Sequence, residues 1–299
     1  MQRIVKNRTM DFETYTSYIK SITAKYPLAE LSTCGKSHLK KELYSLSLGR
    51  GTNYVLYIGG ACGRDFLSPL LLLKFYENLC EKYAKGKELA GIPVREMLYD
   101  RRLIIIPEIN PDGIEIALKG ESATGEYKSV CKAASKGDYS SWNANARGVD
   151  INHNFNVNWK LLHDMEVMKG ASSPSPLCYG GEHAESENET KALVRLCKKL
   201  PIRHAITFHS QGEGIYWKYG ENTPTKSHLM AKIFAAITNY NLAKDKAPNS
   251  HGGFKDWFIS EFSRPAFNVG IGKDVNLLST EFEDIYKKLE EMLCVGIIM

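Results

Sequence analysis

Four short segments of the chain carry side chains that could do chemistry, and each follows or lies near a stretch expected to form a strand. They are Gly59-Gly60-Ala61-Cys62-Gly63-Arg64-Asp65, residues 145–156, His209-Ser210-Gln211-Gly212-Glu213 and Gly270-Ile271-Gly272. In an open α/β sheet, binding and catalytic groups gather in the loops at the carboxyl ends of the strands. The four segments are therefore the candidates for a shared active site.

Each of these segments, taken alone, also has a simpler structural explanation. Cys62 is a small residue of the kind that often fills a core, and His209 follows an apolar run that would place it near the core. Arg147 could cap a helix or pair with Asp150, and the glycines could serve turn geometry. Spacing alone does not decide between an active site and these structural roles.

The elements that would position the segments alternate between strand and helix. The continuous apolar run Leu103-Ile104-Ile105-Ile106 predicts a strand that is buried on both faces. Further strands are expected at 43–48, 54–58, 205–208 and 267–269, and helices at 11–26, 66–82, 185–200, 228–240 and 280–294. Residues 43–48 and 54–58, joined by a tight turn, are predicted to pair as an antiparallel hairpin. The polar stretch from Gly120 to Trp159 is expected to be a functional loop system. The pattern predicts a single α/β domain over residues 1–299, with three α/β/α layers and a mixed central sheet.

Composition excludes several broad classes of protein. The 299 residues include 39 Lys and Arg against 34 Asp and Glu, giving a net charge of +5, with 43% hydrophobic and 24% charged residues. These ordinary values exclude a disordered chain and a collagen-like repeat. Basic residues are interleaved with acidic ones, which does not favour a nucleic-acid groove. Apolar runs such as Leu70 to Leu73 are too short to span a membrane.

The cysteines and the N-terminal residues suggest a compartment. Seven cysteines, an odd number, contain no Cys-x-x-Cys pair and are expected to be free thiols in a reducing environment. The first eight residues are basic but lack the apolar region of a signal peptide. We therefore expect a cytoplasmic protein.

The order of the motifs resembles the zinc carboxypeptidase family, the carboxypeptidase A-like metallopeptidases. Within it, the chain is most similar to the bacterial branch that acts on γ-D-glutamyl-diamino-acid bonds of peptidoglycan peptides. The resemblance covers most of the chain and is carried by residues 11–26, 34–37, 110–113, 145–152, 186–193, 208–213 and 252–258. It implies the family's fold and a peptide or peptidoglycan fragment as the partner; it gives no oligomeric state.

The resemblance also implies a metal site and an oxyanion-stabilising residue. Family members bind zinc through a His-x-x-Glu motif and a later histidine; the matching residues here are Cys62, Asp65 and His209. All three residue types are accepted zinc ligands, so zinc is a possible cofactor. The match to the arginine that stabilises the developing oxyanion is Arg147.

Other matching positions depart from the family's catalytic pattern. The catalytic glutamate corresponds to Gly270, and no tyrosine lies between Tyr240 and Gly270 to match the catalytic tyrosine. In the substrate-binding pair, Asn152 is kept, but the arginine that grips the terminal carboxylate is replaced by His153. A general base typically contributes about 10²- to 10⁴-fold to the rate. The resemblance therefore predicts a catalytically impaired homologue that binds peptides without cutting them.

Three alternatives stay open at this point. The first is a working metallopeptidase with a rebuilt Cys/Asp/His zinc site, which needs a substitute base such as Glu213 or Glu261. The second is a thiol hydrolase in which His209 activates Cys62, although Cys62 more simply fills the space of a lost histidine. The third is a structural or partner-binding module, for which the apolar end at 295–299 is a candidate interface.

Overall fold

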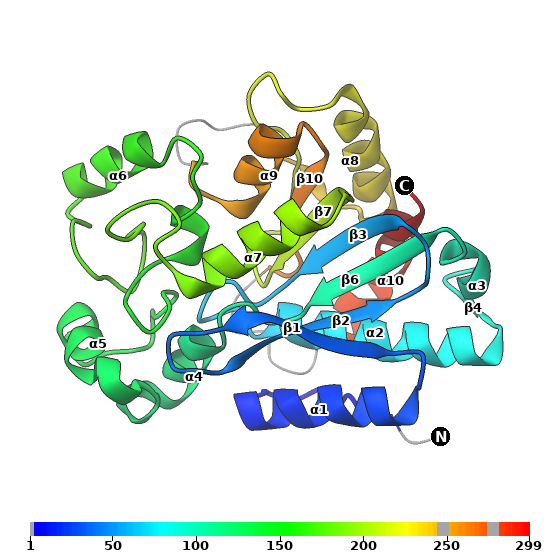
Figure 1. Ribbon diagram of the computed structural model, residues 1–299, viewed down its shortest axis with the longest axis horizontal. Helices are drawn as coiled ribbons and strands as arrows, with labels where there is room; N and C mark the ends of the chain where they lie inside the picture. Colours follow the sequence, from blue (N-terminus) through cyan, green and yellow to red (C-terminus); the bar gives the residue numbers. More distant parts are fainter. Residues whose placement is uncertain (1–2, 244–250, 274–280) are drawn as a thin grey trace.

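A mixed sheet of eight strands forms the centre of the computed structural model, which describes residues 3–243, 251–273 and 281–299 (Figure 1). Its strand order is β1-β2-β6-β3-β7-β10-β8-β9. The strands are β1 (Glu30–Lys36), β2 (Glu42–Leu48), β3 (Asn53–Ile58), β6 (Arg101–Ile106), β7 (Ile202–His209), β8 (Gly214–Tyr216), β9 (Asn241–Leu242) and β10 (Ala266–Gly270). A separate small hairpin joins β4 (Glu88–Leu89) and β5 (Ile92–Pro93).

Helices cover both faces of the sheet (Figure 1). The side chains of β3 and β6 alternate between two cores: Val55 and Leu103 join one, whereas Leu56 and Ile104 join the other. The first core is shared with α1 (Phe12–Lys25), α2 (Leu67–Lys85), α8 (Thr225–Thr238) and α10 (Phe282–Ile298), and the second with α7 (Asn188–Lys199) and α9 (Phe254–Phe262). This arrangement confirms the predicted three-layer α/β/α fold with a mixed sheet.

The predicted hairpin between residues 43–48 and 54–58 is wrong. In the structure β2 pairs antiparallel with β1 and β6, while β3 pairs parallel with β6 and β7. Strand β3 carries four consecutive buried residues, and such a strand gains most from a central position with helices over both faces. At the preceding turn, a Cβ on Gly49 or Gly51 would clash with the backbone at Asp100 and Arg101, so glycine lets β6 start against this turn.

Most of the predicted helices and strands are present, with shifted ends. Helix α1 begins after Asp11, whose side chain accepts a hydrogen bond from the Thr14 N–H at 2.9 Å. Strand β6 is buried on both faces, as its apolar run predicts. The expected start of the last helix, Thr280, lies outside the described residues, and α10 begins at Phe282.

The structure also contains elements that the sequence patterns did not indicate, and the expected loop system between 120 and 159 is partly helical. The additional elements include β1, β4, β5, β8, β9, α4 (Pro111–Lys119), α6 (Trp159–Met168), α9 and the short α3 (Val94–Met97). The polar stretch follows α4 and includes α5 (Lys128–Ser135). All seven cysteines are unpaired, and among the described residues no helix is long and apolar enough to cross a membrane.

Candidate functional site

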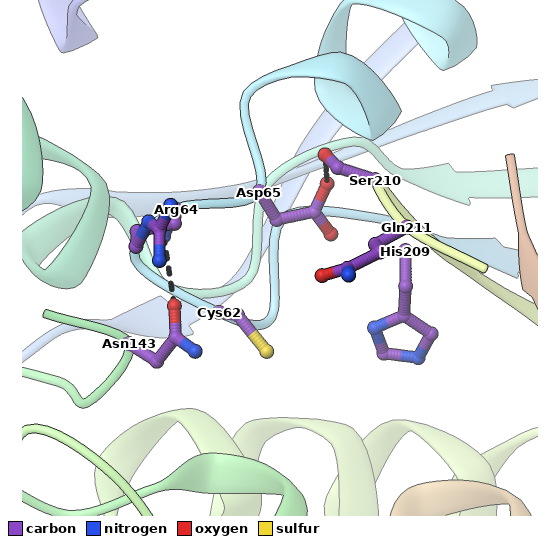
Figure 2. Close-up of a pocket in the computed structure, with 7 residues that line it drawn as sticks. All are labelled: Cys62, Arg64, Asp65, Asn143, His209, Ser210 and Gln211. Atoms are coloured by element: carbon purple, nitrogen blue, oxygen red, sulfur yellow. Dashed lines mark hydrogen bonds between the residues drawn. The ribbon is translucent and has the colours of Figure 1, made fainter. Parts of the chain in front are cut away.

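Two of the candidate segments meet at a cavity of about 190 Å³ (Figure 2). One segment follows β3 and the other follows β7, and these strands are parallel neighbours in the sheet. Because parallel strands end at the same edge, their following loops meet there. The lining residues are Cys62, Arg64, Asp65, Asn143, His209, Ser210 and Gln211.

Asp65 and His209 are both placed in surroundings that favour their neutral forms. Burial raises the pKa of the Asp65 carboxyl and lowers the pKa of the His209 imidazole, although the two groups also attract each other when charged. The Asp65 Oδ1 accepts hydrogen bonds from the Ser210 hydroxyl and, at 3.3 Å, from the Ser68 N–H. Its Oδ2 is buried and has no hydrogen-bond partner among the described residues.

Cys62 is in an environment that opposes thiolate formation. Burial raises the pKa of its thiol well above the ordinary value, and the negative charges of Asp150 and Asp65 raise it further. The single favourable contact in the described part of the chain is the Asn152 side-chain N–H, 3.7 Å from the sulfur. Since a nucleophilic cysteine needs a lowered pKa, this site does not favour the thiol hydrolase alternative.

The predicted zinc ligands share the cavity but are not drawn together around one point. In the described part of the chain, one group of three His, Cys, Asp or Glu residues has all its ligand atoms within 4.8 Å of one another, and it consists of His38, Glu187 and Glu189. Cys62, Asp65 and His209 fall outside that spacing, and Asp65 is turned toward Ser210 (Figure 2). Their side chains as placed do not fit a shared ion, and zinc binding by these three residues stays a prediction.

Gly270 lies beside His209, since β10 and β7 pair in parallel with these two residues in register. A Cβ at Gly270 would lie 2.3 Å from the backbone oxygen of Gln211 and 3.0 Å from the Cα of Gly212. Real side chains do not approach backbone atoms so closely, so the main chain of residues 211–212 occupies the space that a side chain would need. The position that is predicted to correspond to the family's catalytic glutamate has neither a side chain nor room for one.

Neither of the two proposed substitute bases lines the cavity. The Glu213 carboxylate is 3.1 Å from the Lys288 ammonium, and the Glu261 carboxylate is 3.5 Å from the ammonium of Lys198. Among the described residues that line the cavity, Asp65 is the single carboxylate.

Arg147 points to a different cluster. Its guanidinium lies 3.4 Å from the Glu187 carboxylate and 3.3 Å from that of Glu182, and it does not line the cavity. An oxyanion-stabilising role for Arg147 would need this side chain to leave both carboxylates.

Of the two predicted substrate-binding residues, Asn152 contacts a lining residue of the cavity and His153 does not line it. Asn152 contacts the Cys62 sulfur, as described above. The His153 Nδ1 is hydrogen-bonded to Glu166, and its Nε2 is 3.9 Å from the Asp150 carboxylate. Burial opposes the charged ring, but the two carboxylates outweigh it and raise the pKa of His153. In this structure the ring nitrogens of His153 therefore face the carboxylates of Glu166 and Asp150, and His153 does not line the cavity.

Arg64 and Asn143 are lining residues that the sequence reasoning did not single out. The Arg64 N–H donates to the Asn143 Oδ1 at 3.3 Å, which ties the first segment to the chain just before the second. The structure gives the Arg64 guanidinium no ion-pair partner in the described part of the chain. The feature of the sequence that could have identified Arg64 as a lining residue is its position in the loop after β3.

Glu108 supports the same edge of the sheet and was also missed. It directly follows β6 and Pro107, and the next two N–H groups donate to the Gly59 and Gly60 carbonyls at 3.1 and 2.8 Å. Glu108 is 2% exposed, and its Oε1 has no hydrogen-bond partner among the described residues. Burial, and secondly the charge of Glu115, raises the pKa of Glu108 from 4.5 to about 8.

We expect Glu108→Gln to stabilise the protein at alkaline pH. Between pH 4.5 and about 8 the folded protein keeps a proton that the unfolded chain loses, so this carboxyl makes stability fall as the pH rises. Glutamine does not titrate, so Glu108→Gln removes this loss of stability. The expected gain in the free energy of unfolding at pH 8 is about 2–4 kcal/mol, because one pKa unit corresponds to about 1.4 kcal/mol. Denaturant unfolding at pH 5 and pH 8 measures it, with exposed Glu96→Gln as control. An equal pH dependence in wild type and Glu108→Gln would contradict this prediction.

Comparisons with known proteins identify the family and agree with the fold. The zinc carboxypeptidase family model matches residues 15–285. The chain is 26% identical to gamma-D-glutamyl-L-diamino acid endopeptidase 1 of Lysinibacillus sphaericus, over 97% of this chain and 72% of that protein. The fold is similar to thrombin activatable fibrinolysis inhibitor, with a TM-score of 0.79 at 20% identity, covering 99% of this chain and 76% of that one. It is also similar to murein-tripeptide amidase MpaA of Escherichia coli O157, with a TM-score of 0.56 at 18% identity, covering 90% and 92%. Because the family model matches most of the chain, this protein belongs to the zinc carboxypeptidase family.

Proposed function

We propose that this protein binds peptides of the γ-D-glutamyl-diamino-acid class in the cavity between the β3 and β7 loops, without hydrolysing them by the family's mechanism. The observation that carries the proposal is made at Gly270, the position predicted to correspond to the family's base: it has no side chain, and the Gln211 oxygen would lie 2.3 Å from any Cβ placed there. The similarity to an endopeptidase named for that bond supports the choice of ligand class.

The lining of the cavity suits a carboxylate next to an amide. Arg64 offers a guanidinium without an ion-pair partner among the described residues, and a guanidinium can grip a carboxylate with two parallel hydrogen bonds. The side-chain amides of Asn143 and Gln211 can donate to and accept from a peptide unit. A γ-D-glutamyl peptide presents this combination, because its glutamyl residue is linked through the side chain and keeps a free α-carboxylate.

The same lining lacks a group that could activate water in the family's way. Asp65, the single carboxylate among the described lining residues, is predicted to match a metal-ligand position of the family and not its base, and it accepts hydrogen bonds from Ser210 and Ser68. A general base must be able to take a proton near neutral pH within hydrogen-bond reach of the attacking water. The loss of this step alone corresponds to about 10²- to 10⁴-fold in rate.

A working metallopeptidase is the second candidate, and one observation favours it. The buried Asp65 Oδ2 has no hydrogen-bond partner among the described residues, as expected for an oxygen that ligates a cation. Because Cys62, Asp65 and His209 as placed do not fit a shared ion, their side chains would have to move together before they could hold zinc, which would then supply a Lewis acid that polarises a carbonyl. If this candidate is correct, hydrolysis of the peptide rises with added zinc and disappears in a Cys62→Ala/His209→Ala double variant.

A binding titration tests the proposed ligand class. A synthetic tripeptide with a γ-D-glutamyl-diaminopimelate bond is titrated into the protein by calorimetry, beside a matched peptide whose glutamyl residue is linked through its α-carboxyl. We expect saturable binding of the γ-linked peptide that is clearly tighter than that of the α-linked peptide. Equal affinity for both, or no binding of either, would contradict the proposed ligand class.

A further inference from the structure

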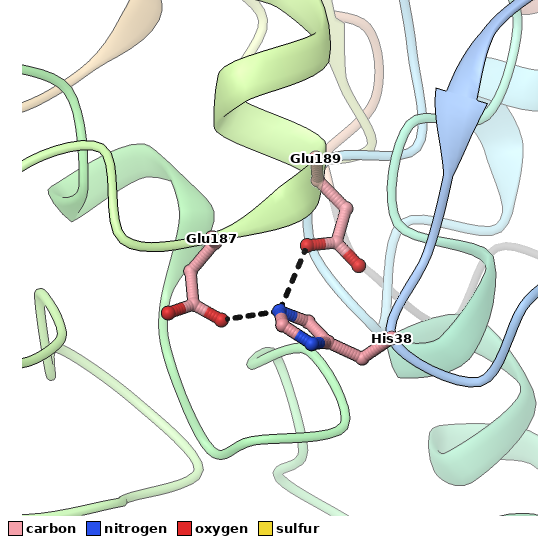
Figure 3. Close-up of side chains that lie close together, drawn as sticks. All are labelled: His38, Glu187 and Glu189. Atoms are coloured by element: carbon pink, nitrogen blue, oxygen red, sulfur yellow. Dashed lines mark ion pairs between the residues drawn. The ribbon is translucent and has the colours of Figure 1, made fainter.

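A second group of chemistry-bearing side chains lies where the start of α7 meets the chain after β1 (Figure 3). His38 comes from the turn after β1, Glu187 is the residue before α7, and Glu189 lies in the first turn of that helix. The His38 Nε2 is 2.9 Å from the Glu187 Oε2 and 3.8 Å from the Glu189 Oε2. One ligand atom from each residue lies within 4.8 Å of the others.

The buried carboxylates of Glu187 and Glu189 differ in the hydrogen-bond donors and cations that lie beside them. The Glu187 Oε1 accepts a hydrogen bond from the Ser186 hydroxyl at 2.7 Å and lies 3.4 Å from the Arg147 guanidinium. The Glu189 side chain is fully buried, yet its Oε1 has no hydrogen-bond partner among the described residues. Its Oε2 accepts a hydrogen bond from the Asn145 side-chain N–H at 3.3 Å. A buried carboxylate with so few donors needs either a proton or a cation beside it.

Asn145 holds the two carboxylates in a fixed relation. Its Oδ1 accepts hydrogen bonds from the backbone N–H groups of Arg147 and Val149 at 3.0 and 3.1 Å, which fixes the orientation of the amide. Its Nδ2 then donates to the Oε2 atoms of Glu187 and Glu189 at 2.7 and 3.3 Å. Hydrogen bonds of this kind orient carboxylate ligands in metal sites.

We propose that His38, Glu187 and Glu189 form a binding site for one divalent transition-metal cation, separate from Cys62, Asp65 and His209. One imidazole nitrogen and two carboxylate oxygens suit Zn²⁺, and two carboxylates neutralise its charge when the histidine is neutral. The Oε1 of Glu189 is buried without a hydrogen-bond partner among the described residues, so a cation beside this carboxylate would compensate its burial. The cation would tie the turn after β1 to the start of α7, and the site does not depend on the proposed peptide binding.

An ion could enter this site from the surface, and an arrangement without any metal could occupy the same space. The His38 side chain keeps 10% of its surface exposed, whereas both glutamates are fully buried, so the ion would enter past the histidine. The competing arrangement is a protonated His38 that bridges the two carboxylates without any metal. The carboxylates raise the pKa of His38 in spite of its burial, which suits this competitor.

Zinc content after removal and return of metal distinguishes the two arrangements. The full chain is stripped with a chelator, titrated with Zn²⁺ alone and measured by elemental analysis, beside Glu189→Gln, His38→Gln and a Cys62→Ala/His209→Ala control. We expect about one zinc per chain in wild type and in the control. Loss of a group that only hydrogen-bonds to a metal ligand typically lowers metal affinity by roughly 10- to 100-fold. Glu189→Gln removes a ligand itself, so we expect its zinc affinity to fall by more than that.

A spectrum of the wild-type protein makes the test independent of how the variants fold. Co²⁺ bound by His38, Glu187 and Glu189 has no sulfur ligand, so we expect d–d absorption without a thiolate charge-transfer band. A thiolate band, or zinc that is lost in the Cys62→Ala/His209→Ala control and kept in Glu189→Gln, would place the ion at the other site. Failure of wild type to take up zinc or cobalt would equally overturn the proposal, in favour of the protonated His38.

Discussion

Replacing Gly270 with glutamate is expected to destabilise the protein and to leave it unable to hydrolyse peptides. Even the single methyl of Gly270→Ala would place a carbon 2.3 Å from the Gln211 oxygen and 2.9 Å from its carbonyl carbon. These are backbone atoms next to a central strand, so they cannot move aside as the end of a flexible side chain would. We expect Gly270→Ala to lower the free energy of unfolding by about 1–3 kcal/mol, the usual cost of overpacking, and Gly270→Glu to cost more.

The matched control is Gly214→Ala, at the neighbouring strand β8. A Cβ on Gly214 would approach no atom within the described structure closer than 3.4 Å, which is ordinary van der Waals contact. Denaturant unfolding of the two alanine variants measures the difference. A Gly270→Ala variant as stable as Gly214→Ala, or a Gly270→Glu variant that hydrolyses the γ-linked tripeptide, would show that the space beside His209 is still open.

Arg64→Ala is expected to weaken binding of the γ-linked tripeptide by about 10- to 100-fold. A hydrogen bond to a charged group contributes about 1.5–3 kcal/mol, and each 1.4 kcal/mol is a factor of ten in affinity. Calorimetric titration measures the change. We expect Arg64→Lys to fall between wild type and Arg64→Ala, because lysine keeps the charge but loses the two-pronged contact.

An arginine outside the cavity provides the comparison for this prediction. Arg203 donates to the Met299 carbonyl at 3.3 Å and does not line the cavity, so Arg203→Ala should leave the affinity near that of wild type. Unchanged affinity in Arg64→Ala would contradict the assignment of Arg64 as the carboxylate-binding group.

The sequence predicted the buried parts of the fold better than the pairing of its strands. An apolar run such as Leu103–Ile106 identifies a strand with both faces covered, and the structure confirms it. The order of strands depends on contacts between distant segments, so β6 could enter between β2 and β3 although adjacency in the chain favoured a hairpin. Short edge strands such as β9, with two residues, leave too little periodicity to be recognised.

The candidate site was predicted to the level of loops but not to the level of side-chain contacts. The loops after β3 and β7 were both expected at the carboxyl ends of strands, and the structure brings Cys62 and His209 to one edge of the sheet because these two strands are parallel neighbours. The direction of a long side chain depends on its neighbours, and Arg147 turns to Glu187 instead of lining the cavity. The room beside Gly270 depends on the path of residues 211–212, which spacing does not reveal.

The His38 cluster was the least accessible to sequence reasoning. Residues 186–193 were recognised as a match to the family, but their chemistry appears only when the turn after β1 places His38 against them. About 150 positions separate these segments, and no local pattern predicts such a contact. The single-domain organisation and the cytoplasmic location stay predictions.

The central claim, binding without hydrolysis, is tested most directly by a single-turnover experiment. The γ-linked tripeptide is incubated with an excess of wild-type protein, in the presence and absence of added Zn²⁺, and both possible products are followed by chromatography. We predict that the tripeptide is bound and recovered intact under both conditions. Stoichiometric cleavage that depends on zinc, and is lost in the Cys62→Ala/His209→Ala variant, would contradict this account and establish a working metallopeptidase.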